Sequence, residues 1–316
     1  MTAIQDGVAG QAAVEPLAQD THSGGTLRVL HVVSGDLWAG AEVQAFTLMT
    51  MLQSMGVEVH AALMNEGELA ARLRSRGIPV TVIDERTLNG LDILLRLRAL
   101  IREIEPTVVH THRTKENVLG SLANLLSKNV PCLRTVHGAP EHKPRALATR
   151  LTLLADRMCG RYLQRRIIAV SSELKQRLQE SYPPDKIVVI QNGIDVGAVR
   201  ERIHPVEFRA AEDGMTHIGI VGRLVPVKRV DLFLEMASLM QRSRPQRRWR
   251  FHIFGDGPLR RELEDGIRAR SLGPTTTLHG HREDVIACIA ALDVLVICSD
   301  HEGLPMNALE ALAVGT

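Results

Sequence analysis

The stretch Leu27-Arg-Val-Leu-His-Val-Val33, together with the residues that follow it, decides the fold. This β-branched run predicts a strand, Ser34-Gly35-Asp36 closes it, and apolar residues recur at helical spacing from Glu42 to Met55. The same order of strand, loop and helix returns as far as Ile190. Strands that alternate with helices pair in parallel through right-handed crossovers, so the pattern predicts an α/β fold with a parallel sheet.

The alternation falls into two series, which predict two domains. The first series predicts strands at 27–33, 58–64, 79–83, 107–110, 132–136, 167–170 and 186–190, and helices at 42–55, 66–76, 91–104, 117–127 and 172–181. The second predicts strands at 217–221, 249–254, 277–279 and 294–298, and helices at 230–241, 259–270, 285–292 and 304–314. From 196 to 214 apolar residues no longer recur at regular spacing, as is typical of a linker or an irregular segment. We expect a disordered tail at 1–26, a first domain at 27–203 and a second at 204–316.

Composition and charge exclude several classes of protein. The 316 residues carry 38 Lys or Arg and 36 Asp or Glu, a net charge of +2, and only 3% are aromatic, which argues against a nucleic-acid partner. No apolar run is long enough for a spanning helix, and the N-terminus has no features of a signal peptide. The four cysteines never form C-x-x-C, so we expect structural thiols in a reducing cytoplasm.

The loop after the first strand of the second series carries two cations. Val221-Gly-Arg-Leu-Val-Pro-Val-Lys228 places Arg223 and Lys228 where the carboxyl end of a parallel strand opens toward the next helix. An Arg fork and a Lys point charge there suit a diphosphate, and the alternative is a solvated basic loop. Gly255 and Gly257 in the next such loop allow close approach, but a dinucleotide fingerprint would need a third glycine where Arg260 stands.

The segment Asp300-His-Glu-Gly-Leu-Pro-Met-Asn-Ala-Leu-Glu310 sets two carboxylates eight positions apart. Glu302 lies in the loop after a predicted strand, and Glu310 could point back from the helix to the same cleft. Gly303, Leu304 and the residues that open the helix offer free N–H groups for an anion or for sugar hydroxyls. The alternative is that Glu302 caps the helix and Glu310 faces solvent.

The first series contributes two histidine motifs and one glycine loop to the same cleft. His137 follows the strand 132–136, although a lone histidine is more often structural. The cluster His110-Thr-His112 has no Cys or carboxylate partner at ligand spacing, so we expect no metal. Gly40 stands at a helix start and either approaches a phosphate or makes a plain tight turn.

A basic helical stripe follows the motif at 135–138. Arg150, Arg157, Arg161 and Arg165 recur beside an apolar stripe made of Leu147, Leu151, Leu154, Met158 and Tyr162. Such a helix either rests on an anionic membrane or approaches a lipid-linked acceptor, or it is a core helix with a solvated Arg face.

Taken together, these motifs resemble those of the retaining, nucleotide-sugar-dependent glycosyltransferases numbered family 4, which have the GT-B fold of two Rossmann-like domains. The resemblance covers about 27–316. The matching elements are Gly40-Ala-Glu42, His110 to Lys115, Thr135-Val-His-Gly138, Val170-Ser-Ser172, Gln191-Asn-Gly-Ile-Asp195, Gly222-Arg223 with Lys228, Gly255-Asp-Gly-Pro258, Gly280 with Asp284, and the paired glutamates.

The resemblance implies a role for each candidate residue. Arg223 and Lys228 would hold the donor diphosphate, and Glu310 would bind the nucleotide ribose. Glu302, with N–H groups near Gly303 and Leu304, would orient the sugar. His137 would lie near the sugar and the acceptor, and Gly40 would back the diphosphate. Retention would proceed by front-face attack with no metal or other cofactor, and the acceptor would be a glycan or a lipid-linked molecule.

Two departures from the family pattern leave alternatives open. Ala39-Gly40 stands where the family often has Gly-Gly. Family members also continue for several elements after the second glutamate, so the second domain is expected to be incomplete, as in a C-terminally truncated chain. The alternatives to a transferase in polysaccharide or glycolipid biosynthesis are an inactive remnant that acts at most as a binding module, and a nucleotide-sugar epimerase.

Overall fold

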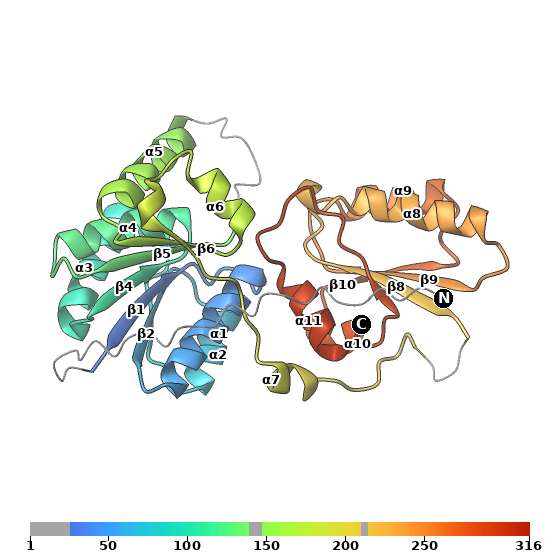
Figure 1. The fold of residues 1–316 in the computed structure, drawn as a ribbon, viewed down its shortest axis with the longest axis horizontal. Helices are drawn as coiled ribbons and strands as arrows, with labels where there is room; N and C mark the ends of the chain where they lie inside the picture. The colour runs from blue at the N-terminus through green and yellow to red at the C-terminus, as the bar shows by residue number, and fades with distance from the viewer. Residues whose placement is uncertain (1–25, 139–146, 210–213) are drawn as a thin grey trace, which may run out of the picture.

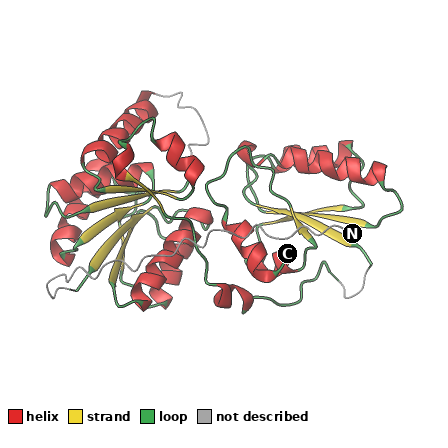
Figure 2. Cartoon of the chain, viewed as in Figure 1, coloured by secondary structure: helices red, strands yellow, loops and turns green. Residues whose placement is uncertain are grey.

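The computed structural model describes residues 26–138, 147–209 and 214–316, with the side chains of 147 and 148 left aside. The described residues form two domains, each with one parallel sheet flanked by helices, and one connecting segment joins them (Figures 1 and 2). The two-domain α/β prediction is therefore confirmed. The expected tail lies, apart from residue 26, outside the described residues.

The first sheet has seven parallel strands in the order β3-β2-β1-β4-β5-β6-β7. They are β1 (Arg28–Val33), β2 (Glu58–Leu63), β3 (Val80–Val82), β4 (Val108–Thr111), β5 (Cys132–Val136), β6 (Arg166–Ala169) and β7 (Ile187–Val189). Their helices are α1 (Gly40–Ser54), α2 (Glu68–Ser75), α3 (Gly90–Ile104), α4 (Thr114–Leu125), α5 (Leu147–Tyr162) and α6 (Ser172–Leu178). The chain order reverses at β1, where β4 pairs on the other side, and such switch points place ligands at the carboxyl ends of the strands.

The alternation of side chains along β1 explains why both faces of this sheet are covered. Leu30 and Val32 pack in a buried cluster with α3, whereas Val33 packs on the other face with α1 and α2. Strands buried on both faces read as continuous apolar runs, as 27–33 does. His31 is fully buried between these apolar neighbours, so the sheet carries a polar group in its interior.

The second sheet has four parallel strands in the order β10-β9-β8-β11. They are β8 (Thr216–Val221), β9 (Trp249–Phe254), β10 (Thr276–Gly280) and β11 (Val294–Leu295). Helices α8 (Val230–Ser243) and α9 (Arg260–Ala269) cover one face, and α10 (Val285–Ala290) and α11 (Met306–Val314) lie on the other (Figure 1). Gly315 ends α11 in the left-handed conformation at φ 88°, which glycine adopts readily at a helix C-cap.

Several predicted bounds differ from those of the structure, for example the helix predicted at 117–127, which begins at Thr114, and the helix predicted at 172–181, which ends at Leu178. The segment 196–214 is not irregular throughout, because α7 (Val196–Arg200) forms where the Asp195 side chain accepts from the Ala198 N–H at 3.0 Å. This single turn is too short to show an apolar period. The strand predicted at 294–298 ends at Leu295, and the helix predicted from Leu304 begins at Met306, because Pro305 precedes it in an extended conformation. The boundary at 203 and 204 stays a prediction.

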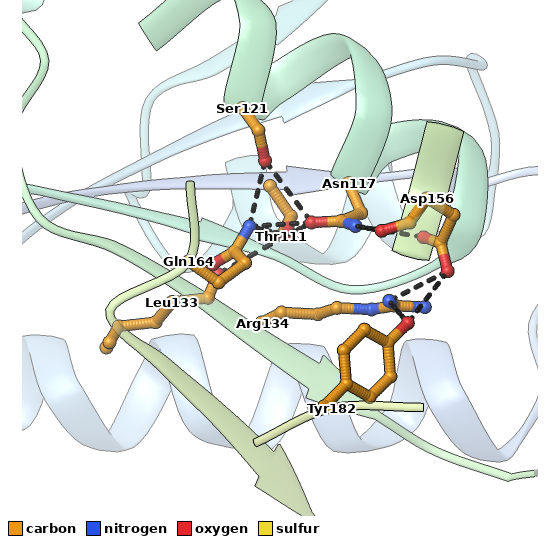
Figure 3. A network of polar contacts seen from close by, with 8 residues as sticks. All are labelled: Thr111, Asn117, Ser121, Leu133, Arg134, Asp156, Gln164 and Tyr182. Atoms are coloured by element: carbon orange, nitrogen blue, oxygen red, sulfur yellow. Dashed lines mark hydrogen bonds and ion pairs between the residues drawn. The ribbon is translucent and has the colours of Figure 1, made fainter. Parts of the chain in front are cut away.

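Helix α5 packs on the first domain through the side that carries Asp156. Asp156, Cys159 and Gly160 are buried, whereas Leu154 and Met158 are exposed. Arg134 on β5 donates to Asp156 at 2.9 Å, and Tyr182 donates to the same carboxylate at 3.2 Å (Figure 3). The interpretation of α5 as a core helix with a solvated Arg face holds for the exposed Arg157 and Arg161, but the expected apolar stripe with Leu154 and Met158 faces outward instead of into the core.

Candidate functional site

Two loops at the carboxyl ends of β8 and β11 line a small pocket. Arg223, Lys228 and Glu302 all line it, together with Ser299 and Asn307. Lys228 lies in a 3-10 turn, η2 (Pro226–Lys228), and its ammonium group forms an ion pair with Glu302. The Ser299 hydroxyl donates to the same Glu302 oxygen at 2.6 Å. The structure thus brings three predicted residues together, and Glu302 is no helix cap, because Pro305 precedes α11.

The same two loops are fastened together beside the pocket. The Asp300 N–H donates to the Val227 carbonyl at 2.9 Å, and Arg229 forms an ion pair with the Asp300 carboxylate at 3.1 Å. The Asn307 amide, at the start of α11, donates to the Val221 carbonyl at the end of β8, at 2.8 Å. These contacts fix the position of Lys228 relative to Glu302 from both sides.

The glycines of the second domain serve the packing of loops. A Cβ on Gly255, whose φ is 130°, would overlap the Gly222 carbonyl, and a Cβ on Gly257 would lie 2.6 Å from the Leu224 carbonyl oxygen. The Leu224 N–H also donates to the Asp256 carbonyl at 2.9 Å. The close approach predicted for Gly255 and Gly257 is thus made to the loop that carries Arg223.

The loop before α11 also reaches the first domain. A Cβ on Gly303 would lie 2.5 Å from the His137 carbonyl oxygen and 2.7 Å from a Val170 methyl group. The Asn192 amide donates to the Leu304 carbonyl at 2.8 Å. A Cβ on Gly40, in the first turn of α1, would lie 3.8 Å from Met306. Gly40, His137, Gly303 and Leu304 therefore all lie where the two domains meet.

Glu310 stands apart from the pocket. It is buried on α11 and is not among the residues that line the pocket of Arg223 and Lys228. Burial raises the pKa of its carboxyl group, and the charge of Arg202 opposes that shift. The alternative in which Glu310 faces solvent is wrong. Its role at a ribose stays a prediction.

His137 belongs to a buried histidine cluster. Its Nε2 lies 3.1 Å from Nδ1 of His112, and His31 lies on the other side of His112. Burial, together with the smaller effects of His110 and Arg113, lowers the pKa of His137 to about 3, so the ring is neutral at physiological pH. The sequence singled out His137 but missed His31, which shows no signal beyond its place inside a strand.

Sequence reasoning also missed Ser299, Asn307 and the side chain of Asn192. Asn307 lies within the segment that carries the two glutamates, and Asn192 lies in the turn Asn192-Gly-Ile-Asp195 that the sequence marks. Both amide oxygens are buried and have no partner among the described residues, although both amide nitrogens donate. Position within a motif was the one signal available for them.

Comparison with known proteins decides the family. The model of Glycosyltransferase Family 4 matches residues 38–198, and that of Glycosyl transferases group 1 matches residues 216–316. The chain belongs to Glycosyltransferase Family 4. It is a glycosyltransferase with the GT-B arrangement of two Rossmann-like domains, as the sequence motifs indicate.

Relatives and solved structures agree with this placement. The chain is 26% identical over 309 residues to UDP-Gal:alpha-D-GlcNAc-diphosphoundecaprenol alpha-1,3-galactosyltransferase of Escherichia coli, covering 94% of this chain and 79% of that protein. It is 26% identical over 313 residues to the putative glycosyltransferase EpsF of Bacillus subtilis, covering 91% and 77%. The Anabaena Alr3699/HepE structure in complex with UDP-glucose superposes with a TM-score of 0.76 at 18% identity, covering 92% and 79%.

Within the described part of the chain, no helix combines the length and the apolar character that crossing a membrane requires.

Proposed function

We propose that this family 4 enzyme transfers a sugar from a nucleoside-diphosphate sugar, with retention, to a glycan or a lipid-linked acceptor. The observation that carries the proposal is the pocket at the carboxyl end of β8, which is lined by Arg223, Lys228 and Glu302. The names of similar proteins support this chemistry. The Escherichia coli relative uses UDP-Gal and a diphosphoundecaprenol-linked sugar, and the Anabaena structure holds UDP-glucose.

In this proposal Arg223 and Lys228 carry the electrostatic part of the reaction. When the bond between the anomeric carbon and the diphosphate breaks, negative charge grows on the phosphate oxygens, and two fixed cations stabilise it. No metal is needed for that charge. The acceptor oxygen bonds to the anomeric carbon on the face that the phosphate leaves, and its proton passes to the departing phosphate. Glu302, which holds Lys228 in the described structure, would orient the sugar.

The role of the two cations is tested by calorimetric titration of the folded chain with UDP, GDP and ADP. Charge-assisted hydrogen bonds contribute about 1.5–3 kcal/mol each, so Arg223→Ala with Lys228→Ala is expected to weaken nucleotide binding by about 100-fold or more. The control is Arg247→Ala with Arg248→Ala. It removes the same charge just before β9, at the amino ends of the strands and therefore at the edge of the sheet away from the pocket. Undiminished binding in the first double variant contradicts the assignment.

The titration also separates the proposal from its alternatives. A folded wild-type chain that binds none of the three nucleotides favours the inactive remnant. Nucleotide binding followed by isomerised donor without any acceptor indicates the epimerase. Transfer with retention is read from the anomeric configuration of the product by NMR.

We propose in addition that α5 places the enzyme on an anionic membrane. Its outward stripe consists of Leu151, Leu154, Met158 and Tyr162, which are 50% to 65% exposed. The exposed Arg157 and Arg161 lie on the same helix. An apolar stripe flanked by arginines matches the acyl boundary and the headgroups of such a membrane. A lipid-linked acceptor would be reached from this position.

Sedimentation with vesicles tests this membrane contact. We expect the chain to sediment with phosphatidylglycerol vesicles at low salt, less at high salt, and not with phosphatidylcholine alone. Leu154→Gln with Met158→Gln is expected to abolish binding. The control is Leu91→Gln with Leu95→Gln, which changes two leucines of α3 that are 63% and 48% exposed. Equal binding by both double variants contradicts the proposal.

A further inference from the structure

Three histidines form a hydrogen-bonded chain: His31 lies on β1, His112 directly follows β4, and His137 directly follows β5. Nδ1 of His31, on β1, lies 3.2 Å from Nε2 of His112, and Nδ1 of His112 lies 3.1 Å from Nε2 of His137. The planes of the His112 and His137 rings differ by 15°. The chain leads from the interior of the first sheet to the place where Gly303 of the second domain meets His137.

Each ring in this chain is neutral and therefore carries one proton. Burial lowers the pKa of all three imidazoles, and the charge of Arg113 adds to this effect at His112 and His137. Because each neutral ring has one N–H and one bare nitrogen, the two hydrogen bonds that join the three rings must both run in the same direction. Either each ring donates from Nδ1 toward His137, or each donates from Nε2 toward His31.

The two ends of the chain favour the first sense. Nε2 of His31 and Nδ1 of His137 are both buried and have no partner among the described residues. One of them must be an N–H and the other a bare lone pair. An N–H left permanently without an acceptor in the sheet interior at His31 is costly and rare. His137 is the residue of this chain that meets the second domain, because its carbonyl lies against Gly303, so an acceptor for an N–H there can come from a substrate bound between the domains.

We propose that His31 and His112 are positioning residues that hold His137 in the Nδ1–H tautomer, so that it donates a hydrogen bond to an oxygen of the bound sugar substrates. The inference rests on the proposed function for the identity of that oxygen. The tautomer itself depends only on the chain of histidines.

A metal ion is the competing use of this cluster. Single ligand atoms of His31, His110 and His112 lie within 4.8 Å of one another. The rings of His110 and His112, however, face each other with centroids 4.4 Å apart and planes 28° apart, so their in-plane lone pairs do not converge on one point. Nε2 of His110 is also engaged in a hydrogen bond with the Thr135 hydroxyl, at 2.8 Å. The geometry therefore favours hydrogen bonding.

The decisive measurement is the tautomer of His137 in the wild-type chain, read from long-range ¹H–¹⁵N correlations of the imidazoles. His137→Gln identifies the signals by their loss. We expect the proton on Nδ1, whereas an unconstrained neutral imidazole favours Nε2. His112→Phe keeps a ring but removes both nitrogens, and is expected to return His137 to the Nε2–H tautomer. It is also expected to lower kcat/KM at least tenfold, with restoration in part by His112→Gln.

His110→Phe is the matched control. His110 is 4% exposed and His112 is 3% exposed, and the two side chains stack, but His110 bonds to Thr135 outside the chain. We expect His110→Phe to leave the tautomer of His137 unchanged.

An Nε2–H tautomer in the wild-type chain overturns the proposal, and so does one equivalent of a transition metal in the purified protein. If His137 has the Nδ1–H tautomer but the protein binds no nucleotide, the positioning role is upheld and the proposed function is contradicted. The two failures are therefore distinguishable.

Discussion

Replacing Asp156 by alanine is expected to destabilise the first domain severely. The Asp156 and Arg134 side chains are each only 6% exposed, and their ion pair measures 2.9 Å. Asn117 donates to the other carboxylate oxygen at 2.9 Å, and Tyr182 closes the group (Figure 3). Asp156→Ala would leave a buried guanidinium with no counter-charge.

The structure allows the size of this effect to be worked out. Removing one partner of a buried ion pair costs about 3–5 kcal/mol, because the other charge stays desolvated. Losing one neutral hydrogen-bonding group costs about 1 kcal/mol, so Tyr182→Phe should be much milder. The exposed pair of Glu173 and Arg177, four residues apart, provides a surface control, and Glu173→Ala should change stability by less than about 0.5 kcal/mol.

The assay is urea unfolding followed by circular dichroism. With a slope of about 2 kcal/mol per M, a loss of about 4 kcal/mol moves the midpoint of the first domain by about 2 M. The reasoning is refuted if the free energy of unfolding of Asp156→Ala is within about 1 kcal/mol of the wild-type value, or is no lower than that of Tyr182→Phe. The buried ion pair would then not hold α5 in place.

Two further predictions concern Glu116 and Gly303. Burial raises the pKa of Glu116 to about 7, so the folded chain binds a proton more tightly than the unfolded chain, and stability is lost as pH rises from about 4.5 to 7. The free energy of unfolding of Glu116→Gln should therefore exceed that of the wild type by on the order of 1–3 kcal/mol at pH 8 and by little at pH 4. Urea unfolding at the two pH values measures this difference. Gly303→Ala should push the loop away from His137 and disfavour the contact between the domains by about 1–3 kcal/mol. That cost should appear as a kcat/KM lowered by roughly 5- to 150-fold, with little change in the thermal unfolding midpoint because the contact lies outside the cores of both domains. Wild-type kinetics in that variant would show that this contact is not needed for activity.

The sequence predicted the elements well where local pattern determines structure. Strands β5 and β9 have the predicted bounds, because short β-branched or aromatic runs are closed on both sides by turn residues. The loop at 222–228 and the segment at 300–310 were also placed correctly at strand ends. Their residues meet because parallel strands bring their carboxyl ends to one edge.

The orientation of α5 could not be predicted, because it depends on a contact outside the helix. The apolar stripe with Leu154 and Met158 is what normally faces a core. Asp156 instead faces inward because Arg134, on a separate strand, is buried there and requires a counter-charge. Periodicity within one helix carries no information about such a partner.

The histidine chain shows the same limit at the level of sheet register. His110 on β4 and His112, directly after the end of that strand, share one face because side chains alternate along an extended backbone, and this much is readable from His110-Thr-His112. That His31 joins them follows from the pairing of β1 with β4, which sets His31 opposite His110. From the sequence alone, these histidines could bind a metal, form a series of hydrogen bonds or simply pack in the core. The choice among these is made by the ring planes and by the unpartnered nitrogens at the two ends, and both arise only once the strands are in register.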